Sequence, residues 1–197
     1  MKYIFIILFL SLTACSSLLS PVKTPPVNTY VLALAHASSP SHAPKNSSVL
    51  LIATPLAAPG YQTADMIYTQ RPFELNHFAQ NRWAAPPAEM LAPLLLQRLQ
   101  DSNCFSAVVT TPFVGNADLI LDTRLLNLQQ EFVGDKSDVR LAVNIILTDN
   151  QTREVVLDKR VEVRVTSEAN NPYAGVVAAN KAVNLVLNKI EKLICKK

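Results

Sequence analysis

The sequence predicts an α+β fold in a single domain, with a mostly antiparallel sheet and two helices packed on one of its faces. Two segments, 139–147 and 155–165, alternate apolar and polar residues, which is typical of antiparallel strands with one buried face. Two other segments, 88–100 and 173–194, carry apolar residues at helical spacing. The chain has 197 residues, of which 49% are hydrophobic and 17% charged, and this composition fits one globular domain.

Residues 1–14 are predicted to be a lipoprotein signal peptide. Lys2 precedes the apolar run YIFIILFL, which is too short to span a bilayer core of about 30 Å. The following sequence, Leu12-Thr13-Ala14-Cys15, resembles a bacterial lipobox, so Cys15 is expected to be lipidated and to begin the mature chain. The alternative is a buried N-terminal strand. Ser16 follows Cys15 where an Asp would retain a lipoprotein in the inner membrane, so resemblance to enterobacterial sorting implies the periplasmic face of the outer membrane.

Residues 15–28 are expected to form a lipidated, flexible tether, because Pro21, Pro25 and Pro26 deny regular hydrogen bonding. The rest of the chain, 29–197, is predicted to be one domain. Its first strand is predicted at Tyr30–Leu34, before a Ser/Pro-rich loop over 36–48.

The next segments predict an alternation of strands and one helix. The continuous apolar run at 49–53 indicates a central strand buried on both faces. Another strand is predicted at 66–73, and 74–80 is interpreted as its continuation around a turn. The helix at 88–100 contains Pro93, which would clash with the preceding turn, so we expect this helix to begin late or to be kinked. A further strand is predicted at 105–111.

The second half of the chain gives the clearest patterns. A long apolar strand is predicted at 118–128, and the segments 139–147 and 155–165 form a hairpin. The last helix follows Asn171 as N-cap and Pro172 at its first position. Its apolar stripe consists of Val176, Val183, Leu187, Ile190 and Ile194.

Motifs for catalysis, cofactors and metals are missing from the sequence. The four glycines are too scattered for a phosphate-binding or dinucleotide-binding loop, and no Ser lies in a G-x-S-x-G elbow. The histidines (His36, His42 and His77) and the cysteines form none of the common zinc or dithiol spacings. We therefore predict a protein that is not an enzyme and has no cofactor or metal. The net charge is +3, or +2 without residues 1–14, which suggests no nucleic-acid partner.

Cys104 and Cys195 remain as two thiols after removal of the signal peptide. In an oxidising periplasm they are candidates for a disulfide across 91 residues, and two free cysteines are the equal alternative.

The segment 60–83 is the part of the chain that packing periodicity explains least. It concentrates tyrosine, arginine and the single tryptophan, a composition typical of interaction hot spots, although an irregular flap of the core is an equal interpretation. The candidate partner-binding residues are Tyr61, Tyr68, Arg71, Arg82 and Trp83, with Arg82 and Trp83 as the anchors.

From Tyr30 to the last helix the chain resembles the auxiliary lipoproteins of ABC-type transporters, the outer-membrane partners of MCE-type intermembrane lipid transport systems. The features that carry this resemblance are the lipobox, Tyr30-Val31-Leu32, residues 60–68, Asn81-Arg82-Trp83-Ala84, residues 105–109 and residues 178–182. The chain departs from the pattern in the insertion at 36–48, in Pro86-Pro87 and in Pro93.

The resemblance implies a non-catalytic α+β domain that docks onto a periplasm-spanning MCE protein. A lipid or hydrophobic-ligand chaperone with its own cavity is the main alternative, and an esterase that uses His77 is a second one. The oligomeric state, including a homo-oligomer, stays open at this point.

Overall fold

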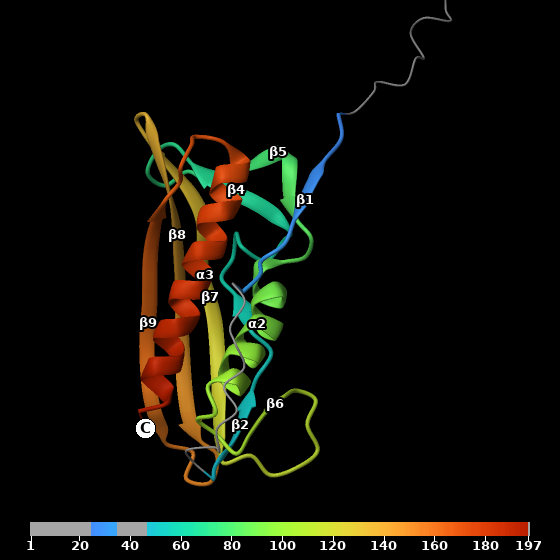
Figure 1. Cartoon of the computed structure of the whole chain (residues 1–197), viewed down its shortest axis with the longest axis vertical. Coiled ribbons are helices and arrows are strands. Elements are labelled where there is room, and N and C mark those ends of the chain that lie inside the picture. Colours follow the sequence, from blue (N-terminus) through green and yellow to red (C-terminus); the bar gives the residue numbers. More distant parts are fainter. Residues whose placement is uncertain (1–24, 35–46, 197) are drawn as a thin grey trace, which may run out of the picture.

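The structure is a computed structural model that describes residues 25–34 and 47–196. These residues form a nine-stranded sheet and two helices, α2 (Pro87–Asp101) and α3 (Pro172–Ile194) (Figure 1). The strands are β1 (Asn28–Tyr30), β2 (Val49–Ile52), β3 (Leu56–Ala57), β4 (Asp65–Thr69), β5 (Asn76–Trp83), β6 (Ala107–Thr110), β7 (Leu119–Val133), β8 (Lys136–Asp149) and β9 (Val155–Thr166). Neither helix is long and apolar enough to cross a membrane within these residues.

The strand β7 organises the sheet. One of its edges pairs with β8 along almost its whole length, and β8 pairs in turn with β9, so these long pairings are antiparallel. The other edge of β7 pairs in parallel with β2, then β3, then β4. The sheet continues from β2 to β6 and from β4 through β5 to β1. The fold is therefore α+β with a mixed, mostly antiparallel sheet, as predicted.

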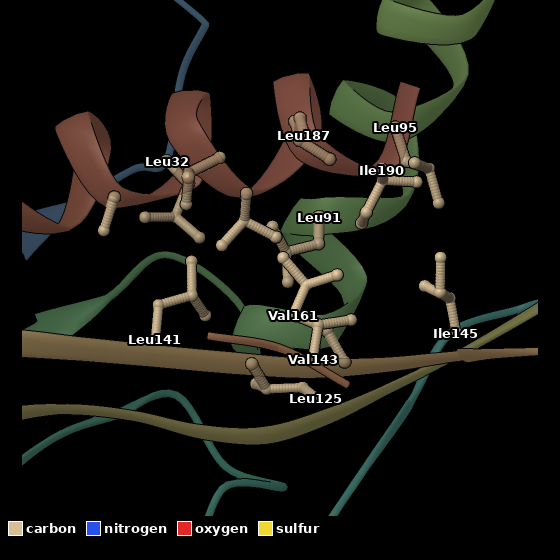
Figure 2. Close-up of a cluster of buried hydrophobic side chains, with 14 of the residues drawn as sticks. Leu32, Leu91, Leu95, Leu125, Leu141, Val143, Ile145, Val161, Leu187 and Ile190 are labelled. Carbon is tan, nitrogen blue, oxygen red and sulfur yellow. The ribbon is translucent and has the colours of Figure 1, made fainter. Parts of the chain in front are cut away.

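Both helices cover the same face of the sheet, where α3 lies on β8 and β9 and α2 lies on β6 and β7 (Figure 1). Figure 2 shows the core between these layers, with Leu95 of α2 and Leu187 of α3 above Leu141 and Val143 of β8. Each of these four side chains is at most 2% exposed. Within the described residues no helix covers the opposite face, which we call the open face.

The predicted C-terminal helix is confirmed together with its start. The Asn171 side chain accepts a hydrogen bond from the Ala174 N–H at 2.9 Å, and Pro172 occupies the first helical position. The five residues of the predicted apolar stripe are all buried. On the sheet below, the alternation of β8 is confirmed too, because its odd-numbered residues from 139 to 147 are at most 2% exposed.

The helix α2 begins at Pro87 and continues through Pro93, so the predicted late start is wrong, while the alternative of a kink at Pro93 stays a prediction. A proline at the first position needs no hydrogen bond for its missing N–H. Inside the helix Pro93 costs about 3 kcal/mol. Burial of Leu91, Leu95 and Leu99 contributes about 1.5–3 kcal/mol each, which outweighs that cost.

The predicted strand at Tyr30–Leu34 is wrong beyond Tyr30, because β1 ends there. The next residues lie along α3 instead, where Asn180 holds them. Its Oδ1 accepts from the Ala33 N–H at 2.6 Å, and its Nδ2 donates to the Val31 carbonyl at 3.3 Å. These bonds replace a strand ladder and leave Leu32 buried in the core (Figure 2).

The prediction that 49–53 is buried on both faces is also wrong. β2 lies inside the sheet between β6 and β7, but only Leu50 and Ile52 are fully buried, while Val49 and Leu51 are partly exposed. The reason is that no second layer of described residues covers the open face at this strand.

The strand β7 is longer than the predicted 118–128 and contains a bulge between Leu125 and Asn127. An extra residue in one strand reverses the inside and outside positions that follow it. Leu125 is therefore buried before the bulge, and Leu128 and Gln130 are buried after it.

Candidate functional site

The predicted segment 60–83 forms the β4–β5 hairpin and the loop before it, at the end of the sheet where α3 begins (Figure 1). The hairpin confirms that 74–80 returns after a turn, although β4 ends at Thr69 and not at Phe73. The segment supplies side chains to both faces of the sheet.

Trp83 belongs to the core, which corrects its choice as a docking anchor. Its side chain is 3% exposed and lines the same small apolar pocket as Met66 and Ala179. A side chain that is covered by α3 and β4 cannot offer its surface to a partner. The neighbouring Arg82 is exposed on β5.

Tyr61 is buried as well, against the open face. Its hydroxyl donates a hydrogen bond to Gln129 Oε1 of β7. Burial raises the pKa of Tyr61, while the nearby Arg140 lowers it and Glu131 raises it to smaller extents. Tyr61 therefore acts as a neutral hydrogen-bond donor that fixes its loop to the sheet.

Tyr68 lies on the helix-covered face in an aromatic cluster. Its ring centroid is 4.5 Å from that of Phe78 on β5 and 5.8 Å from that of Phe132 on β7, and the second pair is edge to face at 87°. Such offset and edge-to-face pairs stabilise beyond the area they bury. The cluster joins three strands and gives the hairpin a rigid base.

Arg71 and Phe73 lie in the exposed turn between β4 and β5. Arg71 forms an ion pair with Glu74, with 2.9 Å between Nε and Oε2. The hydrogen bond between them raises the pKa of Arg71 and lowers the pKa of Glu74. Phe73 has a positive φ of 67° and a fully exposed ring. A bulky residue in this left-handed conformation is uncommon and, where it occurs, often marks a functional site.

The turn and the sheet enclose an open groove of about 630 Å³, which we call the hairpin groove. Its apolar part is the exposed Phe73, Leu75 and Val133, and Arg71 and Arg140 carry charge on its walls. The full lining is Thr69, Gln70, Arg71, Pro72, Phe73, Glu74, Leu75, Gln129, Glu131, Phe132, Val133 and Arg140. The groove thus offers apolar contacts next to fixed charges.

A ladder of alternating charges holds Arg140 in place on the open face. Arg140 pairs with Glu162 at 2.7 Å and lies 3.7 Å from Glu131, while Arg160 pairs with Glu162 at 2.7 Å and Arg164 pairs with Glu131. The strand register puts Arg140 directly opposite Arg164, and Glu131 pairs with both of these arginines. The hydrogen bond from Arg140 is the main cause that lowers the pKa of Glu162 to about 2.

Of the five predicted partner-binding residues, the structure brings only Arg71 into the hairpin groove. Tyr61 contacts the groove through Gln129, and Arg82 lies elsewhere on β5. The sequence analysis did not select Phe73 or Arg140. A proline inside a strand is unusual, so Pro72 within the predicted strand 66–73 could have indicated the exposed turn at Phe73. Nothing in the sequence around Arg140 indicated that it would line the groove.

The remaining candidate residues are the histidines and Cys15. No cluster of three metal-ligating side chains occurs in the described part of the chain, and His77 is exposed on β5. His36, His42 and Cys15 lie outside the described residues.

The structure joins Cys104 and Cys195 by a disulfide, with 5.5 Å between their Cα atoms. Cys104 follows α2 and Cys195 follows α3, so the bond fastens the C-terminal ends of both helices to each other.

Comparisons with solved structures identify the same fold in other bacterial proteins. Protein XCC0632 from Xanthomonas campestris, of family DUF330, has 21% identity and a TM-score of 0.74 over 86% of this chain and 96% of that one. The hypothetical protein CT253 from Chlamydia trachomatis has 7% identity and a TM-score of 0.52 over 77% of this chain and 99% of that one. These likenesses show the fold alone.

Comparison at the level of sequence gives the family. No curated protein matches the chain. The model of the ABC-type transport auxiliary lipoprotein component matches residues 30–191, which is most of the chain, and the chain therefore belongs to this family.

Proposed function

We propose that this protein is a non-catalytic, lipid-anchored adaptor of an ABC-type intermembrane lipid transport system, and that it docks onto a periplasm-spanning MCE protein through the hairpin groove. Membership of the auxiliary lipoprotein family supports the role in transport. The main support for the docking site is the exposure of Phe73. Its ring is fully exposed, at a positive φ, beside Leu75 and Val133.

The groove has the composition of a protein-binding surface. Exposed apolar side chains beside fixed arginines are typical of interface centres, where aromatic residues and arginine contribute most of the binding energy. Arg140 is held by two glutamates, and the ring of Phe132 packs against Tyr68 and Phe78, so these walls of the groove are rigid before a partner arrives. A rigid surface loses less conformational entropy on binding.

The size of the pocket in the core favours an adaptor over a lipid chaperone. The apolar pocket lined by Met66, Trp83 and Leu128 has a volume of about 20 Å³. This volume holds about one water molecule, whereas pockets for larger ligands reach about 300 Å³ or more. The hairpin groove is larger, but it is open to solvent and carries charges on its walls.

Anchoring at the outer membrane is part of the proposal and depends on Cys15. The variant Cys15→Ala should leave the signal peptide uncleaved by the lipoprotein peptidase and remove the protein from the outer-membrane fraction in a density gradient. A normal outer-membrane fraction of the variant would contradict a lipid anchor at Cys15.

Site-specific cross-linking tests the docking surface. A photoreactive phenylalanine analogue at position 73 should cross-link the MCE protein in intact cells. The matched control is the same analogue at Val114, which is equally exposed in the loop after β6. This control should not cross-link the MCE protein. Cross-links from position 73 only to a second copy of the chain would assign the groove to self-association and overturn the docking proposal.

A further inference from the structure

The strand β9 lies at an edge of the sheet, on the other side of β8 from β7. Among the described strands it pairs only with β8, and this pairing runs from Val155 to Thr166. We propose that the free edge of β9 binds an extended acidic segment of a partner protein, which adds to the sheet as another strand.

The backbone of β9 presents hydrogen-bonding groups at this edge. The Lys189 side chain of α3 donates to the Glu162 carbonyl at 3.3 Å, so this carbonyl points away from β8. A residue of an antiparallel strand directs its N–H and its C=O to the same side, and the side alternates along the strand. Arg160 and Arg164 therefore also direct their backbone groups to the free edge.

A basic groove follows the same edge. It has a volume of about 440 Å³ and lies between β9 and the last turns of α3. Its lining is Lys159, Arg160, Val161, Glu162, Lys189, Lys192 and Leu193. We call it the β9 groove. Four of these side chains are basic, and one is acidic.

Part of the positive charge of the β9 groove has no carboxylate partner among the described residues. Its single carboxylate, Glu162, already pairs with Arg140 and Arg160. Within the described residues neither Lys159 nor Lys192 has a carboxylate within ion-pair distance. An acidic partner would therefore meet unpaired cations, and its apolar side chains would contact the partly exposed Leu193 above the buried Val161.

These features favour an acidic peptide over two other possible occupants of the β9 edge, a second copy of the chain and an anionic lipid surface. A second copy of the chain would bring its own Lys159, Lys189 and Lys192 to the same edge, and this repulsion between like charges disfavours self-pairing. An anionic lipid surface would use the charges but leave the backbone edge unpaired. An extended acidic segment uses the backbone groups, the charges and the apolar floor at once, as in β-strand addition.

Binding of a defined peptide to the full chain tests this proposal. The probe is a fluorescent octapeptide of alternating Glu and Val, and anisotropy measures its affinity. Its counterpart carries N-methyl groups on alternate amides, which prevent strand pairing and leave the charges unchanged. We expect the unmodified peptide to bind at least about tenfold more tightly than the N-methylated one, a difference of about 1.4 kcal/mol. Equal affinities would overturn the added strand.

Charge reversal on α3 tests the location. Lys192→Glu should weaken binding about tenfold, because it replaces an attractive charge with a repulsive one. Lys181→Glu is the matched control, since Lys181 is also exposed on α3 but pairs with Glu168 outside the groove, and we expect a change within about twofold. An equal loss in both variants would overturn the site. If phosphatidylglycerol vesicles bind in a Lys192-dependent manner and the peptide does not bind, the β9 groove would be assigned to a lipid surface instead.

This inference is independent of the docking proposal. The β9 groove shares no lining residue with the hairpin groove. Loss of peptide binding in Lys192→Glu should therefore leave cross-linking from position 73 unchanged.

Discussion

Gly175 of α3 lies directly against the Gln130 side chain of β7. A Cβ atom at position 175 would overlap Gln130 Oε1. The Gln130 amide cannot move away freely, because it is 4% exposed and its Nε2 donates to Ser137 Oγ at 2.9 Å and to the Asn171 carbonyl at 3.3 Å. This contact fixes how closely the start of α3 approaches the sheet.

The variant Gly175→Ala should lower the free energy of unfolding by about 1–2 kcal/mol. Alanine gains up to about 1 kcal/mol of helix propensity over glycine. Displacing the Gln130 amide leaves buried polar groups without partners, which costs about 1–3 kcal/mol for each group. Two groups depend on this amide, so the loss exceeds the gain. Urea denaturation measures the difference.

The double variant Gln130→Ala/Gly175→Ala separates the overlap from other effects. Once the Gln130 side chain is removed, Gly175→Ala should no longer destabilise the protein. Additive effects of the two substitutions would mean that they do not interact, and would rule out this contact as the cause.

Removing the disulfide should destabilise the protein strongly. The variant Cys104→Ala/Cys195→Ala frees a loop of 91 residues, and the chain-entropy model gives a loss of about 4.6 kcal/mol. The unvaried protein in reducing agent should unfold at the same denaturant concentration as the variant. Unchanged stability in reducing agent, or two alkylatable thiols in protein isolated from the periplasm, would contradict the bond.

The neighbours Trp83 and Arg82 should respond in opposite ways to truncation. Trp83→Ala empties a core position and should cost about 3–5 kcal/mol of stability. Arg82→Ala changes an exposed side chain and should stay within about 0.5 kcal/mol. Chemical denaturation of both variants measures this. A Trp83→Ala variant with unchanged stability would contradict the burial of the indole.

The charge ladder predicts a loss of stability in acid. The pKa of Glu162 is lowered from 4.5 to about 2, so its ionised form stabilises the folded state. This contribution is fully present above pH 4.5 and disappears as the pH falls to about 2. We therefore expect Glu162→Gln to be less stable than the unvaried protein near neutral pH, with a difference that shrinks over this range. Denaturation at a series of pH values measures it, and a difference independent of pH would be inconsistent with the ladder.

The sequence predicted best those elements that a single repeating pattern determines. The alternation of β8 and the apolar stripe of α3 follow directly from one buried face each. The bulge after Leu125 and the path of residues 31–34 along α3 could not be predicted, because they depend on contacts with distant residues such as Asn180.

Composition singled out the segment 60–83, but it could not show where each side chain of that segment lies. Tyr61 and Tyr68 have similar neighbours in the sequence, yet they lie on opposite faces of the sheet. Trp83 was expected at the surface because tryptophan is common in interfaces, and burial under α3 makes it a core residue instead. Arg140 enters the hairpin groove from another strand, which only the fold can place there.

The most direct test of the docking proposal compares Phe73→Glu with Val114→Glu in binding to the MCE protein. Both side chains are apolar and fully exposed, so neither substitution should lower stability. We expect Phe73→Glu to weaken binding at least about thirtyfold, as for an interface hot spot of about 2 kcal/mol, while Val114→Glu leaves the affinity unchanged. Equal affinities of both variants and the unvaried protein would contradict docking through the hairpin groove.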